Sequence, residues 1–178
     1  SLGNDRYQFT YKLYRDCQGS LPPLAANMLV KSSSCGQFFQ VNLVRQTTSG
    51  TEIGFQCAGS TTCEGGTQPG VQEYIYSAET VLPAHCSDWR FSISDCCRNA
   101  AISNILQPEV TGIYTEAFLN NSAGENSSPV FTIDPVTIFC KGQRVHYNPG
   151  VLETDGDSIA YALTPALTGE NTFVTYAN

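Results

Sequence analysis

The sequence predicts an all-β protein, an antiparallel β-sandwich of the Ig-like or jelly-roll-like kind that is stapled by disulfides. Three observations predict it: apolar residues alternate with polar ones in short runs, clusters of Gly, Pro, Asn, Asp and Ser separate the runs, and eight cysteines occur among 178 residues. No helical pattern lies between the runs, so the strands are expected to pair antiparallel in two packed layers. The apolar fraction of 41% is large enough to fill a core.

The clearest strand spans residues 6–16, where Tyr7, Phe9, Tyr11 and Leu13 recur at every second position. This period places the four side chains on one face of a half-buried strand. The same criterion predicts further strands at residues 37–46, 71–79, 88–94, 112–120, 129–133, 136–140, 143–148, 158–164 and 171–176. Only residues 95–106 are compatible with a turn or two of helix.

A change in composition near Pro149 and Gly150 predicts a boundary in the chain. Residues 1–150 are expected to form a disulfide-rich β-sandwich domain. Residues 151–178 are expected either to supply edge strands to that domain or to begin a cadherin-like module.

The charge of the chain excludes several classes of partner. Its formal net charge of −7, without any Lys/Arg cluster, would repel a nucleic-acid backbone. No run of about 18 apolar residues occurs, so we expect no membrane insertion. Charged residues make up 14% of the chain, against about 25% in typical soluble domains, and this favours an extracellular protein, in a mature form from which any leader has been removed.

The cysteines indicate an oxidised, exported protein. They are even in number, no CxxC pair occurs and the chain has only two histidines, so disulfides are favoured over zinc sites. The eight residues are Cys17, Cys35, Cys57, Cys63, Cys86, Cys96, Cys97 and Cys140.

Cys96 and Cys97 are expected to bond to two different partners. Neighbouring residues of a strand point to opposite faces, and a disulfide normally joins Cα atoms about 4.4–6.8 Å apart. Cys86 is a local candidate partner for Cys96. Cys57 and Cys63 are expected to pair with each other within one Gly/Thr-rich loop, which leaves the remaining cysteines open.

Several ordered motifs carry a resemblance that spans nearly the whole chain. They are GNDRYQFTYKLYRDCQG, SSSCG, TTCEGGTQPGVQEYIY, LPAHCSDWRFSISDCCRNAAISN, FLNNSAGENSSPVF, CKGQRVHYNPG and TDGDSIAYAL. The chain resembles the N-terminal region of large Bacteroidetes cell-surface proteins, which are associated with gliding motility or type IX secretion and continue into cadherin-like or PKD-like repeats. In those proteins another strand usually precedes the segment equivalent to SLGN, and further β structure follows the present C-terminus.

The resemblance implies a non-enzymatic extracellular structural protein on the bacterial cell surface, either the subunit of a surface filament or a module of a large adhesin. A sandwich that lacks an edge strand exposes unpaired backbone groups that a neighbouring copy can fill. We therefore expect copies of the chain to assemble by strand exchange or edge pairing. The alternative is a secreted carbohydrate-binding module that acts as a monomer on surface glycans, with Tyr74 or Tyr76 stacked on sugar rings, although strand aromatics usually pack in the core.

One candidate metal site lies in the acidic stretch 151–163. Glu153, Asp155 and Asp157 alternate across a turn that contains Gly156, and carboxylates at this spacing can converge on Ca²⁺. The resemblance to cadherin-like repeats adds to this interpretation, whereas the alternative is an ordinary solvated turn. No cofactor is required by any other motif.

The remaining motifs are weak. Asn120 and Asn126 begin N-x-S sequons, and Ser158 follows Asp157 in a pattern that resembles an O-linked acceptor of these bacteria. No catalytic motif such as G-x-S-x-G or H-E-x-x-H occurs, and His85 and His146 stand alone, so we expect no enzymatic activity.

Overall fold

The computed structural model describes residues 1–54, 59–135, 138–139 and 142–177. Its strands form a nine-stranded sheet and a separate two-stranded sheet, and all their pairings are antiparallel. A single 3₁₀ turn, Pro108–Val110, is the only helical element of the described residues. The predicted all-β antiparallel fold is therefore confirmed. The strands are β1 (Arg6–Asp16), β2 (Ala25–Ser32), β3 (Gln37–Arg45), β4 (Thr51–Ile53), β5 (Val71–Val81), β6 (Trp89–Asp95), β7 (Ile113–Leu119), β8 (Val130–Phe131), β9 (Val151–Leu152), β10 (Leu167–Gly169) and β11 (Thr172–Phe173).

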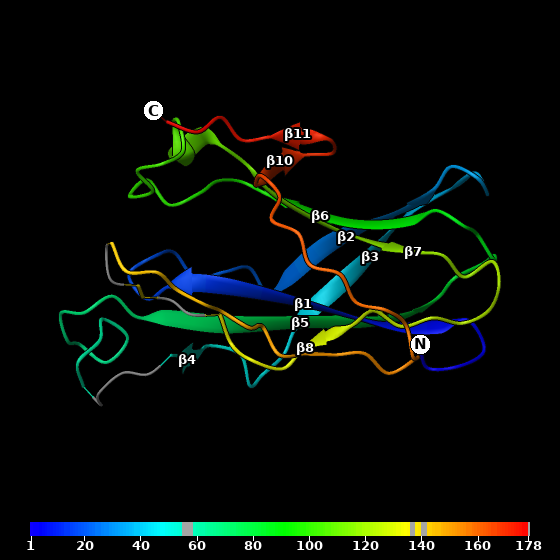
Figure 1. The fold of residues 1–178 in the computed structure, drawn as a ribbon, viewed down its shortest axis with the longest axis horizontal. Coiled ribbons are helices and arrows are strands. Elements are labelled where there is room, and N and C mark those ends of the chain that lie inside the picture. Colours follow the sequence, from blue (N-terminus) through cyan, green and yellow to red (C-terminus); the bar gives the residue numbers. More distant parts are fainter. Residues whose placement is uncertain (55–58, 136–137, 140–141, 178) are drawn as a thin grey trace.

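The large sheet curls over on itself. Its strand order is β1-β5-β3-β2-β6-β7-β10-β11, with β4 paired to β5. Figure 1 shows β1 and β5 in one layer and β6 and β7 in the other, with β2 and β3 crossing between the two layers. Strand β1, at one end of this order, and strand β7, near the other end, therefore lie on opposite layers of one sandwich.

The core lies between these layers and is built by the alternation that the sequence predicts. Trp89 and Val30 are fully buried, and Phe9 of β1 packs against Phe91 of β6 with ring centroids 4.7 Å apart. Phe39 meets the Trp89 ring edge-on at 6.2 Å. These contacts join the first layer to the second through side chains that face inward at period two.

The pairing of β1 with β5 is the longest ladder in the molecule. It runs without interruption through eleven pairs, from Arg6 opposite Val81 to Asp16 opposite Val71. Because one face of each strand is buried, a slip of one residue would turn every core side chain outward, so the alternation fixes this register.

The C-terminal residues pair with strands of the preceding part of the chain. Strand β9 pairs with β8, and β10 pairs with β7 through Leu167 and Tyr114. Strand β11 then pairs with β10. Lys31 and Arg90 both make ion pairs with Glu170 in the turn between β10 and β11, which attaches this hairpin to β2 and β6.

Several predicted elements are not formed. Residues 143–148 and 158–164 contain no strand, and residues 95–106 contain no helix. The predicted strand at 136–140 lies partly outside the described residues. Strands β2, β4, β9 and β10 form where no strand run was predicted.

Three disulfides join six of the cysteines: Cys17 to Cys63, Cys35 to Cys86, and Cys96 to Cys97. Cys57 and Cys140 lie outside the described residues. The predicted pair Cys57–Cys63 is wrong because Cys17 follows β1 directly, and its N–H donates to Gly70 O at 3.0 Å, beside the loop that carries Cys63.

The predicted pair Cys86–Cys96 is also wrong, because the turn between β2 and β3 carries Cys35 next to Cys86. The expectation of separate partners for Cys96 and Cys97 is wrong as well. That expectation assumed a strand through both residues, but β6 ends at Asp95, so strand alternation no longer directs these two side chains.

Within the described residues there is no helix with the length and apolar character needed to cross a membrane.

Candidate functional site

The outer edge of β1 is open. This strand pairs with β5 on one side, and no described strand pairs with it on the other. Asp5 O accepts from Leu82 N at 2.9 Å, and Cys17 N donates to Gly70 O at 3.0 Å, so the odd-numbered residues direct their backbone groups toward β5. The even-numbered residues therefore direct their N–H and C=O groups outward. At the two ends of the strand these groups bond to nearby turns, Arg6 to Leu2 and Gly3 and Asp16 to Gly19. The residues between them whose outward groups have no described backbone partner are Gln8, Thr10, Lys12 and Tyr14.

The core beneath this edge is incomplete. Tyr7 is buried, but the next three inward-facing side chains of β1, Phe9, Tyr11 and Leu13, are only partly buried against the core. Strand β7 on the opposite layer is also open, because its only pair with β10 is Tyr114 with Leu167. From residue 115 to residue 119 the outer edge of β7 has no strand partner in the described part of the chain.

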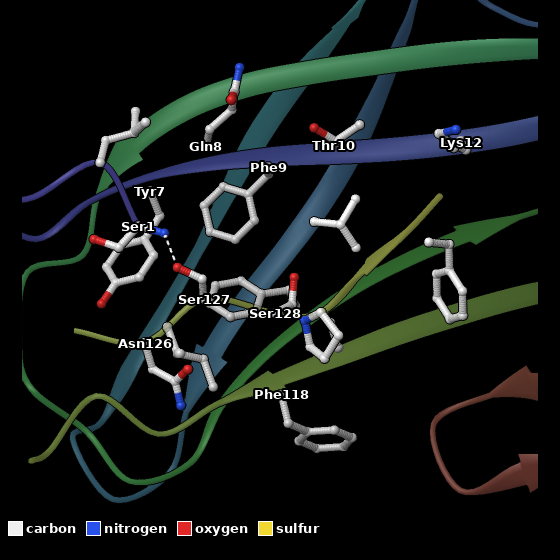
Figure 2. Close-up of a pocket in the computed structure, with 17 residues that line it drawn as sticks. Ser1, Tyr7, Gln8, Phe9, Thr10, Lys12, Phe118, Asn126, Ser127 and Ser128 are labelled. Carbon is white, nitrogen blue, oxygen red and sulfur yellow. Dashed lines mark hydrogen bonds between the residues drawn. The ribbon is translucent and has the colours of Figure 1, made fainter. Parts of the chain in front are cut away.

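A groove of about 470 Å³ lies between these two open edges. Residues 7–10 and Lys12 of β1 line one side, Phe118 and its neighbours on β7 line the other, and residues 126–131 lie between them. Figure 2 shows Phe9 and Phe118 on opposite sides of Ser127 and Ser128. The groove is thus the open side of the sandwich, with aromatic rings on both walls.

Residues 125–127 are attached to the N-terminal segment. The Ser1 ammonium donates to Ser127 Oγ at 2.9 Å, and Asp5 N donates to Glu125 Oε1 at 3.3 Å. The Ser1 hydroxyl, followed by the N–H of Asp5, lowers the pKa of Glu125 below its usual value. No backbone hydrogen bond of strand type is described between residues 126–131 and β1, so this segment covers the groove without completing the sheet.

A second groove of about 390 Å³ adjoins the same strand. Its walls carry the exposed rings of Tyr14, Phe131 and Tyr147, together with Lys12. Lys12 Nζ lies 2.8 Å from Glu73 Oε1, and the Tyr14 hydroxyl donates to the same oxygen at 3.1 Å. Burial, followed by the charge of Glu73, raises the pKa of Tyr14 to about 12.

The tyrosines proposed for sugar stacking are core residues instead. Tyr74 is 6% exposed and Tyr76 is 1% exposed, and Tyr76 donates its hydroxyl proton to Pro23 O at 2.8 Å. The expectation that either ring stacks on a sugar is therefore wrong. Both face inward on β5 in phase with Phe9 and Tyr11 of β1.

The Glu153 carboxylate accepts hydrogen bonds from the backbone of the turn that follows it. It accepts the N–H groups of Asp155, Gly156 and Asp157 at 2.9, 2.5 and 2.7 Å, and the Asp155 N–H is the leading cause that lowers the pKa of Glu153. Asp155 Oδ2 accepts from Ser127 N at 2.5 Å. The described residues contain no group of three or more His, Cys, Asp or Glu placed to hold a metal ion. The local structure is thus a turn, which was the alternative to a metal site, and calcium binding stays a prediction.

The candidate modification sites lie in exposed or partly exposed positions. Asn120 and Ser158 are exposed, and Asn126 is half-buried beside the groove. Asn120 Oδ1 accepts from Ser122 N at 3.0 Å. Glycosylation of these residues stays a prediction.

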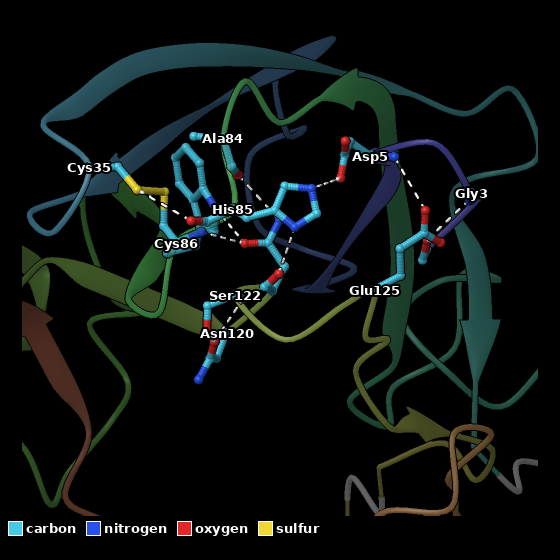
Figure 3. A network of polar contacts seen from close by, with 12 residues as sticks. Gly3, Asp5, Cys35, Ala84, His85, Cys86, Asn120, Ser122 and Glu125 are labelled. Carbon is cyan, nitrogen blue, oxygen red and sulfur yellow. Dashed lines mark hydrogen bonds and ion pairs between the residues drawn. A yellow bond between two sulfur atoms is a disulfide. The ribbon is translucent and has the colours of Figure 1, made fainter.

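His85 lies in a surface network and not in either groove. Figure 3 shows its ring between Asp5 and the 120–122 turn: Nε2 is 3.0 Å from Asp5 Oδ1, and Nδ1 is 3.0 Å from the carbonyl oxygen of Asn121. The imidazole therefore connects the N-terminal segment to the loop after β7. The described network brings no hydroxyl or thiol nucleophile to the ring.

Asn121 has a structural role that none of the sequence motifs indicated. It is completely buried, and its Oδ1 accepts from Cys86 N at 2.7 Å and from Trp89 Nε1 at 3.2 Å. Its Nδ2 donates to Ala84 O at 3.3 Å. One amide side chain thus satisfies the polar groups around the central tryptophan, and no feature of the sequence distinguishes it from Asn120.

Asp88 attaches the β2–β3 turn to the second layer. Its carboxylate accepts the N–H groups of Ser33 and Ser34 at 3.1 and 2.9 Å and the hydroxyls of Ser32 and Ser34 at 2.5 Å. The Ser32 hydroxyl, then that of Ser34, lowers the pKa of Asp88 from 3.8 to about 2.

We expect this carboxylate to contribute a pH-dependent part of the stability. A folded pKa below the unfolded value gives stability that is fully present above pH 4 and is lost as the pH falls toward 2. In Asp88→Asn the melting temperature should be lower at neutral pH and should change less between pH 4 and pH 2 than in the wild type. Parallel slopes for the two proteins in thermal denaturation would contradict this role.

Comparison of the chain with protein-family models, with curated proteins and with solved structures found no match.

Proposed function

We propose that the protein is a non-enzymatic structural protein of the bacterial cell surface, a filament subunit or adhesin module that assembles by adding a strand to the open side of the sandwich. One observation supports this most directly: β1 is eleven residues long and has a free outer edge above a groove with apolar walls. Such an edge is a template for another chain, because the outward N–H and C=O groups of Gln8, Thr10, Lys12 and Tyr14 have no described backbone partner.

The charges of β1 leave this edge accessible. Natural edge strands often avoid association by directing lysines or other charges outward. Here the three basic side chains of β1 are held by side chains of β5, Arg6 by Glu79 at 2.6 Å, Lys12 by Glu73 at 2.8 Å and Arg15 by Gln72 at 2.6 Å. The two glutamates neutralise Arg6 and Lys12, and the Gln72 amide holds the Arg15 guanidinium by a hydrogen bond, so all three cations are directed against the neighbouring strand instead of the outer edge.

An exported location supports the same proposal. Cys17–Cys63 and Cys35–Cys86 close loops of 46 and 51 residues across the sandwich. Structural disulfides of this kind persist in oxidising compartments. A subunit outside the cell benefits from such cross-links because they restrict the unfolded chain.

Electron microscopy of the purified, oxidised protein tests the proposal. We expect fibres or short oligomers from the wild type. Thr10→Pro should prevent them, since it removes an outward-facing N–H and leaves the hydrogen bonds to β5 intact. Thr10→Ala is the matched control and should assemble like the wild type.

A wild-type protein that stays monomeric at high concentration would overturn the filament proposal. The carbohydrate-binding alternative would then be favoured if the monomer bound glycans, because the second groove presents Tyr14, Phe131 and Tyr147 beside Lys12. Aromatic rings next to charged hydrogen-bonding groups suit the stacking of sugar rings. Loss of that binding in Tyr147→Ala would locate it in this groove.

A further inference from the structure

One segment outside the sheets has the pattern of a strand and lacks a partner. In residues 158–164 (SIAYALT), Ile159, Tyr161 and Leu163 alternate with Ser158, Ala160, Ala162 and Thr164. The three large side chains are 39%, 63% and 105% exposed, respectively. Every residue from 154 to 165 is exposed, and no strand is assigned to this stretch.

Such exposure has a cost that strand pairing would remove. Each large apolar side chain that leaves water contributes about 1.5–3 kcal/mol. A period of two places the three apolar side chains on one face of an extended segment and the small residues on the other. The segment therefore suits a site that is apolar on one side and open to solvent on the other.

The open side of the sandwich has this form. Its walls are Phe9, Phe91 and Phe118 together with residues 117 and 119, and its rim is the free backbone edge of β1. Seven extended residues span about 23 Å at 3.3 Å per residue. The free edge from Tyr7 to Tyr14 is one residue longer, so the segment and the edge match in length.

We infer that residues 158–164 of one copy pair with the outer edge of β1 of a second copy and place Ile159, Tyr161 and Leu163 in its groove. This inference rests on the proposed function and names the strand that is added. A donor and an acceptor at different places on one chain make a head-to-tail contact, which generates open filaments when the rotation does not close.

The fold of the single chain favours pairing of residues 158–164 with a second copy over pairing within the same chain. Pro165 stands between the segment and β10, and it lacks the N–H with which β10 could be extended along β7. In its own molecule the segment is therefore bounded by β9 on one side and by a proline on the other.

The first test uses a matched pair of substitutions in the segment. Leu163→Asp places a charge on the apolar face, and Ala162→Asp places the same charge on the opposite face. Leu163→Asp should raise the concentration needed for assembly by at least about tenfold, equivalent to about 1.4 kcal/mol. Ala162→Asp should leave assembly near the wild-type level, and both should keep the wild-type melting temperature, since both residues are exposed.

The second test mixes two blocked chains. Thr10→Pro retains a functional donor and Leu163→Asp retains a functional acceptor, so each alone should be monomeric and an equimolar mixture should give heterodimers in analytical ultracentrifugation. No fibre should form, because each heterodimer has one blocked donor and one blocked edge left.

The outcomes separate this inference from the filament proposal. Fibres from Leu163→Asp at wild-type concentrations would overturn the inference and leave the filament proposal standing. Monomeric wild type in which residues 158–164 are protected from hydrogen exchange would mean that the segment pairs within its own chain, and this result would overturn both. Fibres from the wild type with heterodimers from the mixture would support both.

Discussion

Removal of the Cys35–Cys86 disulfide is expected to lower the free energy of unfolding by about 4 kcal/mol. The bond closes a loop of 51 residues, and the loss of chain entropy in the unfolded state for a loop of this length corresponds to about 4 kcal/mol. Cys86 is also buried at 2% exposure beside Trp89, so its replacement removes packing as well. The change is a large part of the roughly 5–15 kcal/mol that stabilises a typical domain.

Urea denaturation of the Cys35→Ala/Cys86→Ala protein measures this effect. The Cys96→Ala/Cys97→Ala protein is the matched control, because that disulfide joins adjacent residues and closes no loop. It should unfold within about 1 kcal/mol of the wild type, as expected for sites away from the core. Equal losses in the two variants would contradict the pairing, and peptide mapping without reduction would identify the true partners.

Replacing Asn121 with leucine is expected to lower the free energy of unfolding by about 2–6 kcal/mol. Leucine fills nearly the same space but cannot accept the protons of Cys86 N and Trp89 Nε1, which stay buried without a partner. Each unsatisfied buried donor costs about 1–3 kcal/mol. The loss of the bond from Nδ2 to Ala84 O adds to this sum.

Thermal or chemical denaturation of Asn121→Leu and Asn120→Leu compares a buried amide with its exposed neighbour. Asn120 makes its hydrogen bonds locally to Ser122, at the surface, so its replacement should change stability by less than about 1 kcal/mol. If both variants lost the same stability, the polar network around Trp89 would not be the cause. Near-ultraviolet circular dichroism reports whether the Trp89 environment changes only in the first.

The strands with strict alternation were predictable from the sequence. Strands β1, β3, β5, β6 and β7 fall on predicted runs, because aromatic and β-branched residues recur at every second position. Strand β2 could not be predicted in this way, since AANMLVKS begins with two alanines and an asparagine. These residues form a strand because β3 and β6 pair with them on both sides, and such pairing is a property of the whole fold.

The strands predicted at 143–148 and 158–164 do not form, although their sequences have the pattern of a strand. Alternation in SIAYALT describes which side chains share a face, but it does not say which strand will pair with the segment. In the structure of one chain no described strand does. Of the candidate site, the sequence indicated an open edge in general terms, whereas β1 as that edge and the groove beside Phe118 depend on how the sheet curls.

The disulfide pairing shows the same limit. Cys17 and Cys63 meet because β1 and β5 pair in a register that brings residue 17 opposite Gly70. Spacing along the chain favoured Cys57 for Cys63, but sequence distance carries no information on which loops a sheet brings together.

The uninterrupted β1–β5 ladder also determines how the molecule responds to tension. The N- and C-terminal ends lie toward opposite ends of the long axis in Figure 1, and β1 runs along this axis. A pull on the chain before β1 therefore slides it along β5 and loads the interstrand hydrogen bonds together, in shear, instead of opening them one after another. Cys17 follows the last residue of that ladder and is bonded to Cys63, so even a detached β1 would transmit the load into a covalent cross-link.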